Sequence, residues 1–218
     1  MTRTIILMGA GTGERMDSDI PKQFIEINGI PIIAHTYNRL KNIQNLKILI
    51  VLPEKNYSKW KKYISNFIEE ETILVRGGKT RNISVRNGIK SINDDGYVGI
   101  HDGVRPFFSK ALIEKLFNEA EKRGNAIPYT NSINSLRKVD KKTNESTSVD
   151  RSNYVQIQTP QVFQLNKLVK IFNKVDGINY SDESSLIETE GIKINLVLGE
   201  EQNIKITTKR DLRFFLKN

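Results

Sequence analysis

The sequence predicts an α/β protein in which helices flank a mostly parallel sheet. Short apolar runs rich in β-branched residues alternate along the chain with longer segments of helical periodicity. The apolar runs are hydrophobic at successive positions, as in strands that are buried on both faces. Glycine or proline follows the first runs, at the points where a parallel strand would lead into a helix. The alternation and the doubly buried strands together favour this fold class.

Strands and helices can be assigned in order as far as residue 122. Strands are expected at residues 4–8, 47–52, 72–75 and 97–101, and helices at residues 31–40, 57–67, 80–92 and 110–122. The first strand ends at glycine, the second at Pro53 and the third at Gly77-Gly78. In the helix at residues 80–92, Ile83, Ile89 and Ile92 recur close to the helical period.

The segment at residues 126–150 departs from this alternation. Short strands are expected at residues 127–129 and 135–139, and a polar turn is expected after them at residues 140–144. A hairpin with so few apolar residues is not stable alone, which predicts that it packs against another chain. Helices at residues 164–174 and 184–190, a strand at 192–197 and a helix at 209–216 follow. No repeat or linker divides the chain, so we expect one domain over residues 1–218 with a dimerisation β-arm at about 129–152.

Composition excludes several classes of function. Of the 218 residues, 38% are hydrophobic, which is enough for a substantial core. The absence of cysteine excludes disulfides, cysteine nucleophiles and thiolate metal sites, and two histidines are too few for a polyhistidine site. The apolar run at residues 5–8 is too short for a signal peptide or a membrane span. We therefore expect a soluble, cytoplasmic protein without a membrane partner.

The basic charge needs its own interpretation. The chain has 34 Lys and Arg against 25 Asp and Glu, a formal charge of +9, and a pI of about 9.6. Such a field attracts nucleic acids and nucleotide triphosphates alike. The cations are scattered, and no basic stretch is interleaved with aromatic residues that could stack on bases. Nucleic acid is therefore not expected as a partner, and a basic nucleic-acid-binding protein is kept only as the alternative from another class.

The loop after the first strand has the features of a phosphate site. In parallel sheets, ligands bind at the carboxyl ends of strands. Residues 9–16 follow the pattern G-x-G-x-G, which is neither the dinucleotide-binding fingerprint nor a Walker A loop. Glycines allow backbone N–H groups to approach a phosphate closely. Arg15 and Lys22 add two cations, which suits a triphosphate. The alternative is a tight turn with surface charges.

The loop at Gly77-Gly78 is open to two interpretations. Its backbone groups and the hydroxyl of Ser84 could bind the edge of a nucleobase. The alternative is a simple helix entry, with the glycines in the turn and Thr80 as the N-cap.

The loop at residues 101–106 contains a candidate metal ligand. Asp102 directly follows a buried strand and could hold Mg²⁺, which needs only one or two carboxylates beside phosphate and water oxygens. The alternative is that Asp102 pairs with Arg105 and braces the loop. We assign His101 to packing or hydrogen bonding, because nucleotidyl transfer to an ionised phosphate needs no general base.

Taken together, the motifs resemble those of the 2-C-methyl-D-erythritol 4-phosphate cytidylyltransferases. They occur in order over essentially the whole chain: Gly9-Ala10-Gly11-x-Gly13-x-Arg15-Met16, Pro21-Lys22-Gln23, Gly77-Gly78 with Arg81 and Ser84, His101-Asp102-x-x-Arg105-Pro106, Val149-Asp150-Arg151, Thr159-Pro160-Gln161-x-Phe163, Ser181-Asp182-Glu183 and Gly199-x-x-x-Asn203-Ile204-Lys205-Ile206-Thr207. The resemblance implies a Rossmann-like nucleotidyltransferase fold and a homodimer joined by protruding β-arms. It also implies a Mg²⁺-dependent reaction in which CTP and a polyol phosphate give a CDP-polyol and pyrophosphate.

The resemblance assigns roles to individual residues. The expected catalytic residues are Arg15, Lys22 and Lys205. The expected CTP-binding residues are Gly9, Ala10, Gly11, Gly13, Arg15, Lys22, Gly78, Lys79, Ser84 and Asp102, with Asp102 also the Mg²⁺ ligand. The expected acceptor-binding residues are Arg105, Ser135, Arg151, Ser181, Asp182 and Lys205, with Arg151 supplied by the arm of the other subunit. Lys79 departs from the acidic residue of some relatives, and Ser135 and Ser181 replace threonine.

The resemblance leaves two acceptors open. 2-C-Methyl-D-erythritol 4-phosphate, an isoprenoid precursor, is the expected acceptor. D-Ribitol 5-phosphate, used for wall or capsule polymers, is the alternative because the sibling enzymes share most of these motifs. The short arm and Ser181-Asp182-Glu183 favour methylerythritol. A nucleotide-binding regulator without turnover is disfavoured, because the expected arginines, lysines and aspartate are all present.

Overall fold

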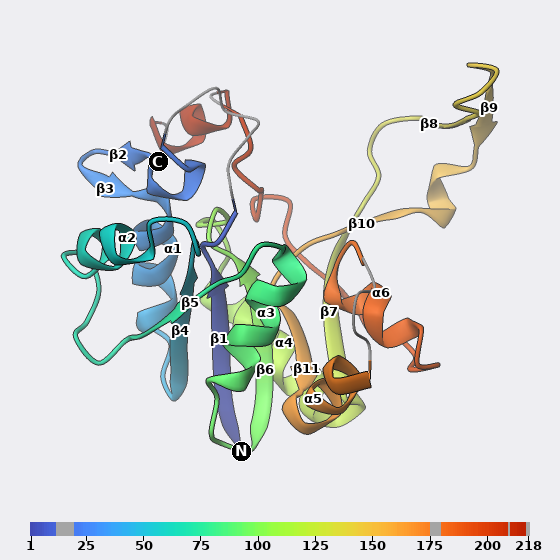
Figure 1. Cartoon of the computed structure of the whole chain (residues 1–218). Coiled ribbons are helices and arrows are strands. Elements are labelled where there is room, and N and C mark those ends of the chain that lie inside the picture. Colours follow the sequence, from blue (N-terminus) through green and yellow to red (C-terminus); the bar gives the residue numbers. More distant parts are fainter. Residues whose placement is uncertain (12–19, 175–179, 209, 217–218) are drawn as a thin grey trace.

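The computed structural model describes residues 1–11, 20–174, 180–208 and 210–216. Within these residues the main sheet has eight strands in the order β10-β7-β11-β6-β1-β4-β5, and β12 pairs with β7. The parallel part consists of β1 (Thr2–Met8), β4 (Leu46–Leu52), β5 (Ile73–Arg76) and β6 (Gly96–Asp102). Figure 1 shows helices on both sides of the sheet. The predicted α/β fold with a mostly parallel sheet is confirmed.

Strand β1 is an inner strand of the sheet, between β4 and β6. Its side chains alternate between the two faces: Ile5 and Leu7 join the core on one side, and Ile6 joins the core on the other. All three are fully buried. A strand covered on both faces needs apolar residues at successive positions, which is why the unbroken apolar run predicts it.

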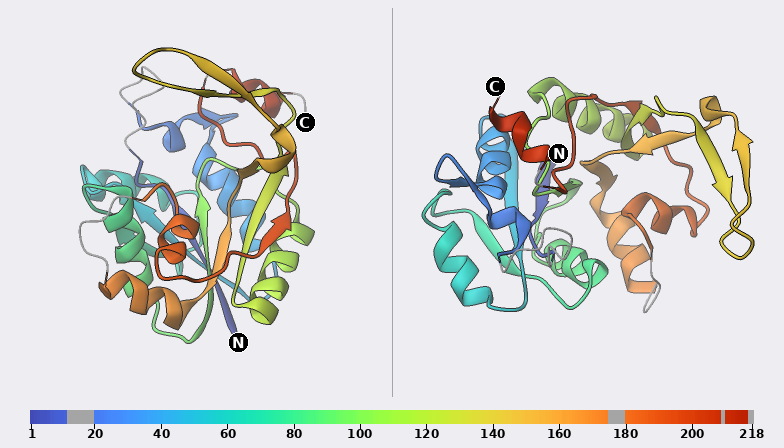
Figure 2. Two further views of the ribbon diagram at one scale, coloured as in Figure 1. Left: turned by 90° about the vertical axis from the view of Figure 1, so that its right-hand side faces the viewer. Right: turned by 90° about the horizontal axis from the view of Figure 1, so that it is seen from above.

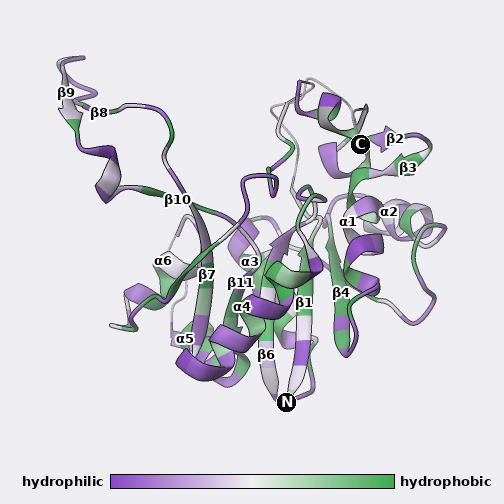
Figure 3. Cartoon of the chain, turned by 180° about the vertical axis from the view of Figure 1, so that it is seen from behind, coloured by the Kyte–Doolittle hydropathy of each residue, from purple (hydrophilic) through white to green (hydrophobic). Residues whose placement is uncertain are grey.

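Two layers of helices cover the sheet. Helices α1 (Ile32–Lys41), α2 (Tyr57–Ile64) and α4 (Lys110–Arg123) pack on the face of Ile5, and α3 (Arg81–Lys90), α5 (Leu165–Lys174) and α6 (Glu183–Glu188) pack on the face of Ile6. Figure 2 shows this layering from the side and from above. Hydrophilic and hydrophobic bands alternate along α4 in Figure 3, as in an amphipathic helix with one side in the core. The helix predicted at residues 57–67 ends earlier, at Ile64.

The second half of the sheet is partly antiparallel. It consists of β7 (Asn125–Asn131), β10 (Val155–Ile157), β11 (Gln161–Gln164) and β12 (Leu196–Leu198). Strand β11 runs antiparallel between β6 and β7, and β10 runs antiparallel to β7. The sequence pattern predicts neither β10 nor β11, because glutamines interrupt the apolar runs. Gln158 and Gln161 are nevertheless buried, since their carboxamides bond the main chain at Glu200 and Ser184.

Two expectations near the C-terminus are wrong in detail. The strand predicted at residues 192–197 is shorter and later, because the side chain of Asn125 bonds the main chain at Lys193 and Asn195 there. The helix predicted at residues 209–216 is a short 3-10 helix, η4 (Asp211–Leu216). The carboxylate of Asp211 accepts the N–H groups of Thr207 and Thr208. These bonds fix a turn at the start of η4.

The predicted arm is a hairpin that projects from the sheet. Strands β8 (Leu136–Val139) and β9 (Ser146–Val149) pair antiparallel, and the short helix η3 (Arg151–Asn153) follows. Figures 1 and 2 show the hairpin extending away from the helices and the sheet. Ile133, Val139 and Tyr154 on and beside it are exposed, at 69%, 53% and 49%. Apolar side chains in such a position are typical of a surface that another protein chain covers.

Small elements complete the described fold. The 3-10 helix η2 (Lys22–Phe24) and the hairpin of β2 (Glu26–Ile27) and β3 (Ile30–Pro31) precede α1. No helix in the described part of the chain is long and apolar enough to cross a membrane.

Candidate functional site

A pocket of about 300 Å³ lies where three loops leave the carboxyl ends of the parallel strands. It is lined by Met8, Ala10, Gly11, Lys22, Gln23, Gly78, Lys79, Thr80, Arg81, Asp102, Val104 and Lys205. A second cavity, of about 260 Å³, lies between α5 and residues 192–195 at the other edge of the sheet. The described lining residues of the second cavity include no acidic residue and no carboxyl end of a parallel strand. The first pocket is therefore the candidate site.

The three loops begin in the same way. The N–H of Gly9 donates to the carbonyl of Val51, that of Gly77 to Leu52 and that of Gly103 to Met8, at 2.8–2.9 Å. Each bond extends the strand ladder by one step, so the loops leave the sheet side by side. A Cβ at Gly77 would lie 2.8 Å from the Leu52 carbonyl oxygen, which explains the need for glycine there.

The loop before α3 is both a helix entry and part of the pocket, so both interpretations of its sequence apply. Thr80 caps the helix, because its hydroxyl accepts the N–H of Ile83 at 3.2 Å. Gly78 and Lys79 line the pocket as predicted for CTP-binding residues. Ser84 is buried behind them, where its hydroxyl accepts the N–H of Gly78 at 3.0 Å. In this structure Ser84 does not line the pocket; it holds the backbone of the loop.

Asp102 is the acidic residue of the pocket, and two cations share it. Lys205 Nζ lies 2.9 Å from its Oδ2, and Arg105 Nε lies 3.2 Å from the same oxygen. The Asp102 side chain is only 12% exposed. Burial alone would raise the pKa of Asp102, but the charges of Lys205, Arg105 and Arg81 hold it well below its usual value. Asp102 is therefore ionised at neutral pH.

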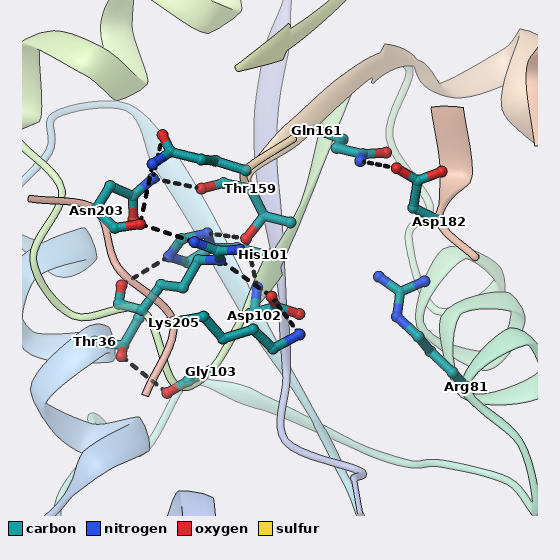
Figure 4. A network of polar contacts seen from close by, with 12 residues as sticks. Thr36, Arg81, His101, Asp102, Gly103, Thr159, Gln161, Asp182, Asn203 and Lys205 are labelled. Carbon is teal, nitrogen blue, oxygen red and sulfur yellow. Dashed lines mark hydrogen bonds and ion pairs between the residues drawn. The ribbon is translucent and has the colours of Figure 1, made fainter. Parts of the chain in front are cut away.

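Hydrogen bonds of neighbouring residues place Lys205 beside Asp102. The N–H of Ile206 donates to the Val104 carbonyl at 2.9 Å. Asn203 is fully buried, and its Nδ2 donates to the Thr159 carbonyl at 2.9 Å. These bonds fix the residues on both sides of Lys205, as Figure 4 shows for Asn203 and Thr159.

Arg105 braces this corner of the site. Its Nη1 donates to the Asn203 carbonyl at 2.8 Å while its Nε meets Asp102. The side chain is 11% exposed. The structure thus contains the Asp102–Arg105 pair of the alternative interpretation. Arg105, a predicted acceptor-binding residue, points toward the loop and not into the open pocket.

His101 is a neutral, buried hydrogen-bonding residue. The hydroxyl of Thr159 accepts the N–H of Asp102 at 3.0 Å, so its own hydrogen faces His101 Nδ1 at 3.1 Å. The hydrogen of His101 then lies on Nε2 and donates to the Arg105 carbonyl at 3.2 Å. Burial lowers the pKa of His101 to about 4. His101 therefore supports the loop, in line with its expected role.

The opposite wall of the site holds a buried ion pair that the sequence analysis did not assign. Glu183 is 0% exposed, and its carboxylate binds the guanidinium of Arg81 through both oxygens. Arg81 lines the pocket at the start of α3. Figure 4 shows Arg81 across the site from Asp102 and Lys205. Arg81 and Glu183 both belong to the motifs of the sequence, which marks them as candidate site residues. Their pairing is seen only in the fold.

Asp182 and Ser181 lie next to this ion pair. Asp182 caps α6, accepting the N–H of Ser185 at 3.0 Å, and it also accepts Gln161 Nε2 at 2.8 Å. Ser181 is exposed, with its hydroxyl 2.9 Å from that of Ser185. Neither of these predicted acceptor-binding residues is among the described lining residues of the pocket, but both directly precede Glu183, which pairs with Arg81 in its wall.

Removal of the Arg81 cation is expected to destabilise the fold. Arg81→Gln leaves the fully buried Glu183 carboxylate without its cation, at a cost of about 2 kcal/mol, below the full cost for a buried pair because Arg81 is partly exposed. Urea unfolding of both proteins measures this change. The matched control is Lys47→Gln, which breaks the exposed pair with Asp94 and should cost less than about 0.5 kcal/mol. Equal losses in the two variants would contradict the prediction.

The predicted residues of the arm lie apart from the pocket of their own chain. Ser135 and Arg151 are exposed and are not among the lining residues. The guanidinium of Arg151 donates to the carbonyl of Ile133 within the arm. Gly13 and Arg15 lie outside the described residues.

Comparison with known proteins identifies the family. The profile of the family described as IspD, 2-C-methyl-D-erythritol 4-phosphate cytidylyltransferase, matches residues 4–215. The chain is 34% identical over 215 residues to the enzyme of this name from Bacteroides thetaiotaomicron, covering 98% of this chain and 97% of that protein. The chain belongs to the 2-C-methyl-D-erythritol 4-phosphate cytidylyltransferase family. It is thus an enzyme, a nucleotidyltransferase, and the resemblance drawn from the motifs is confirmed.

Further members of the cytidylyltransferase family agree with this assignment. The enzyme from Clostridium perfringens is 36% identical over 214 residues, covering 95% of this chain and 94% of that protein. The crystal structure of 4-diphosphocytidyl-2C-methyl-D-erythritol synthase from Anaerococcus prevotii matches with a TM-score of 0.84 and 26% identity, over 100% of this chain and 96% of that one. The bifunctional IspDF from Campylobacter jejuni matches with a TM-score of 0.82 and 25% identity, over 98% of this chain and 54% of its own. The Rossmann-like nucleotidyltransferase fold of the family is therefore also that of this chain.

The donor set of the cytidylyltransferase pocket is consistent with Mg²⁺. The described part of the chain contains no group of three or more His, Cys, Asp or Glu residues that could hold a metal alone. Among the described residues, the pocket instead presents one ionised carboxylate, that of Asp102, beside backbone groups of two glycine loops. Mg²⁺ commonly takes one or two carboxylates and completes its shell with phosphate and water oxygens. The residues present fit such an ion when a triphosphate is bound.

Proposed function

We propose that this protein transfers CMP from CTP to 2-C-methyl-D-erythritol 4-phosphate in a Mg²⁺-dependent reaction. The observation that carries the proposal is the pocket in which ionised Asp102 meets Lys205 beside Lys22 and two glycine loops. A site with one carboxylate, several cations and exposed loop backbone suits a nucleoside triphosphate. The family supplies the identity of the two substrates.

The reaction is a displacement at phosphorus. An oxygen of the acceptor phosphate attacks the α-phosphorus of CTP, and the bond from that phosphorus to the oxygen bridging to the β-phosphate breaks. The electron pair of this bond leaves with pyrophosphate. Negative charge grows on the non-bridging and leaving oxygens, so catalysis requires positioning and fixed cations more than a general base.

Each part of the pocket has a role in this reaction. Lys22 and Lys205 stabilise the growing charge, and we assign Arg15 to the same function. Asp102 would hold Mg²⁺, which when bound would neutralise triphosphate oxygens. Backbone groups at Gly78 and Lys79 face the cytosine and ribose, where main-chain donors and acceptors can match the edge of the base.

The acceptor site is completed by a second copy of the chain. Ser181 and Asp182 lie at the rim of the proposed site, next to Glu183. The described residues of this wall offer no guanidinium that is free to bind a phosphate dianion, since Arg81 is engaged with Glu183. Arg151 lies on an exposed arm that extends away from its own pocket. A homodimer joined through the arms would place Arg151 of the partner subunit, with Ser135, at this rim.

The reaction itself is tested by incubating the protein with CTP, Mg²⁺ and one polyol phosphate at a time. Pyrophosphate release is expected with 2-C-methyl-D-erythritol 4-phosphate. Release with D-ribitol 5-phosphate in its place would assign the sibling activity. Release with neither acceptor would refute the proposed function.

A mixed-dimer experiment tests the shared site. Arg151→Ala and Lys22→Ala chains should each be nearly inactive as homodimers. Mixing equal amounts should restore about a quarter of the parental activity, because half the dimers then have one intact site with Arg151 from one chain and Lys22 from the other. Steady-state rates in a mixture shown by mass to contain heterodimers measure this recovery. Absence of recovery would mean that Arg151 acts within its own chain or not at all.

A further inference from the structure

Gln23 connects the glycine loop after β1 to the segment that carries Lys22. Its side chain is 2% exposed, and its Nε2 donates to the carbonyl oxygens of Gly9 at 2.5 Å and Gly11 at 2.8 Å. A carboxamide has two N–H donors, and both are directed to this one loop. Gln23 takes no direct part in the proposed reaction.

The two carbonyl groups matter because carbonyl oxygens repel phosphate oxygens, whereas N–H groups attract them. In a trans peptide the C=O of Gly9 and the N–H of Ala10 point in opposite directions. A donor that holds the Gly9 carbonyl therefore also fixes the N–H of Ala10, a residue that lines the pocket. Glycine places little restraint on its own backbone, so the orientation of this loop depends on an outside partner.

The segment around Gln23 provides a rigid base for this contact. The N–H of Phe24 donates to the Pro21 carbonyl at 2.8 Å, which closes the turn of η2. The Phe24 ring is buried and stacks on Trp60, with centroids 4.1 Å apart and an interplanar angle of 2°. Lys22 belongs to the same turn, so its backbone is held relative to the glycine loop by the neighbouring Gln23.

We propose that Gln23 is a positioning residue that holds residues 9–11 of the glycine loop in their triphosphate-binding form and in register with Lys22. This inference rests on the proposed function, because the ligand it concerns is CTP. Loss of the carboxamide donors should weaken CTP much more than the acceptor, since the acceptor contacts lie on Ser181, Asp182 and the arm.

The test compares Gln23→Met, which keeps length and removes both donors, with Asn125→Leu as a matched control. Asn125 is likewise buried and bonded through its carboxamide to backbone, but it lies at the opposite edge of the sheet. We expect Gln23→Met to weaken CTP binding by about tenfold in calorimetry without acceptor, the scale of two lost hydrogen bonds. The KM for CTP should rise, and the KM for the acceptor should change less than about threefold. Asn125→Leu should lower thermal stability and leave both KM values unchanged.

Hydrogen exchange of the ligand-free protein supplies a readout that does not depend on CTP. Amides of residues 8–11 should exchange faster in Gln23→Met than in the parent, whereas Asn125→Leu should leave them unchanged. Should Gln23→Met fail to fold, Gln23→Asn keeps the carboxamide but is one methylene too short to reach both carbonyls, and the same changes are expected.

The outcomes separate this inference from the proposed function. A parent that fails to bind CTP would refute the proposed function, while faster exchange in the Gln23 variant would still support the loop restraint. A parent that binds CTP, together with a Gln23 variant of parental affinity and parental exchange, would overturn the inference.

Discussion

Lys205→Ala should lower kcat by about two to four orders of magnitude while the protein remains folded. Its ammonium lies in the pocket 2.9 Å from Asp102, where the negative charge of the transition state is expected to develop. The side chain is largely outside the core, and the bonds of Asn203 and Ile206 that place it come from neighbouring residues. Removal of the charge therefore affects the reaction more than the fold.

Steady-state pyrophosphate release with saturating CTP and acceptor measures the change in kcat. Lys22→Ala should show a loss of the same order, because Lys22 also lines the pocket. Lys193→Ala is the matched control, because Lys193 is exposed at the opposite edge of the sheet. A Lys205→Ala protein with near-parental kcat would remove Lys205 from the mechanism.

Asp102→Asn should lower activity by at least about two orders of magnitude at low Mg²⁺ and raise the Mg²⁺ concentration needed for half-maximal rate. The substitution keeps the shape of the side chain and removes the charge that a divalent cation requires. It also leaves Lys205 and Arg105 without their anion, so both cations can then compete with Mg²⁺ for the triphosphate.

A titration of pyrophosphate release against Mg²⁺ checks this prediction. Asp94→Asn provides the control, since Asp94 pairs with Lys47 on the surface and should leave the titration unchanged. If Asp102→Asn responded to Mg²⁺ like the parent, Asp102 would serve only to brace Arg105 and Lys205.

Helices α3 and α4 and the parallel strands could be predicted from the sequence, because apolar runs and helical periodicity are local patterns. Strand β1 has apolar residues at successive positions because both of its faces are covered, and this requirement is visible in five or six residues. Glycines at the strand exits, including Gly77, are required by backbone contacts of the adjoining strand. The motif carrying Asp102 lies in one short stretch, so its position at a strand end was also predictable.

Strands β10 and β11 were not predictable in the same way. Strand β11 contains buried glutamine, which is polar in the sequence but satisfied by a distant backbone in the fold. The hydrophobic pattern of the sequence therefore cannot distinguish β11 from a loop. The proposed approach of Arg151 to the pocket of a partner subunit likewise has no local signal beyond an arm that is poor in apolar residues.

The sequence by itself determined the fold class, the family and the chemical character of the site, because these depend on local periodicity and on short motifs. Only the tertiary structure decided which of these residues meet. Lys205 reaches Asp102, Glu183 neutralises Arg81, and Gln23 holds Gly9 and Gly11, each across segments that are separate in the chain. Such contacts depend on the packing of whole elements against one another, since an ion pair or a hydrogen bond forms only where the surrounding core places both partners within about 3 Å.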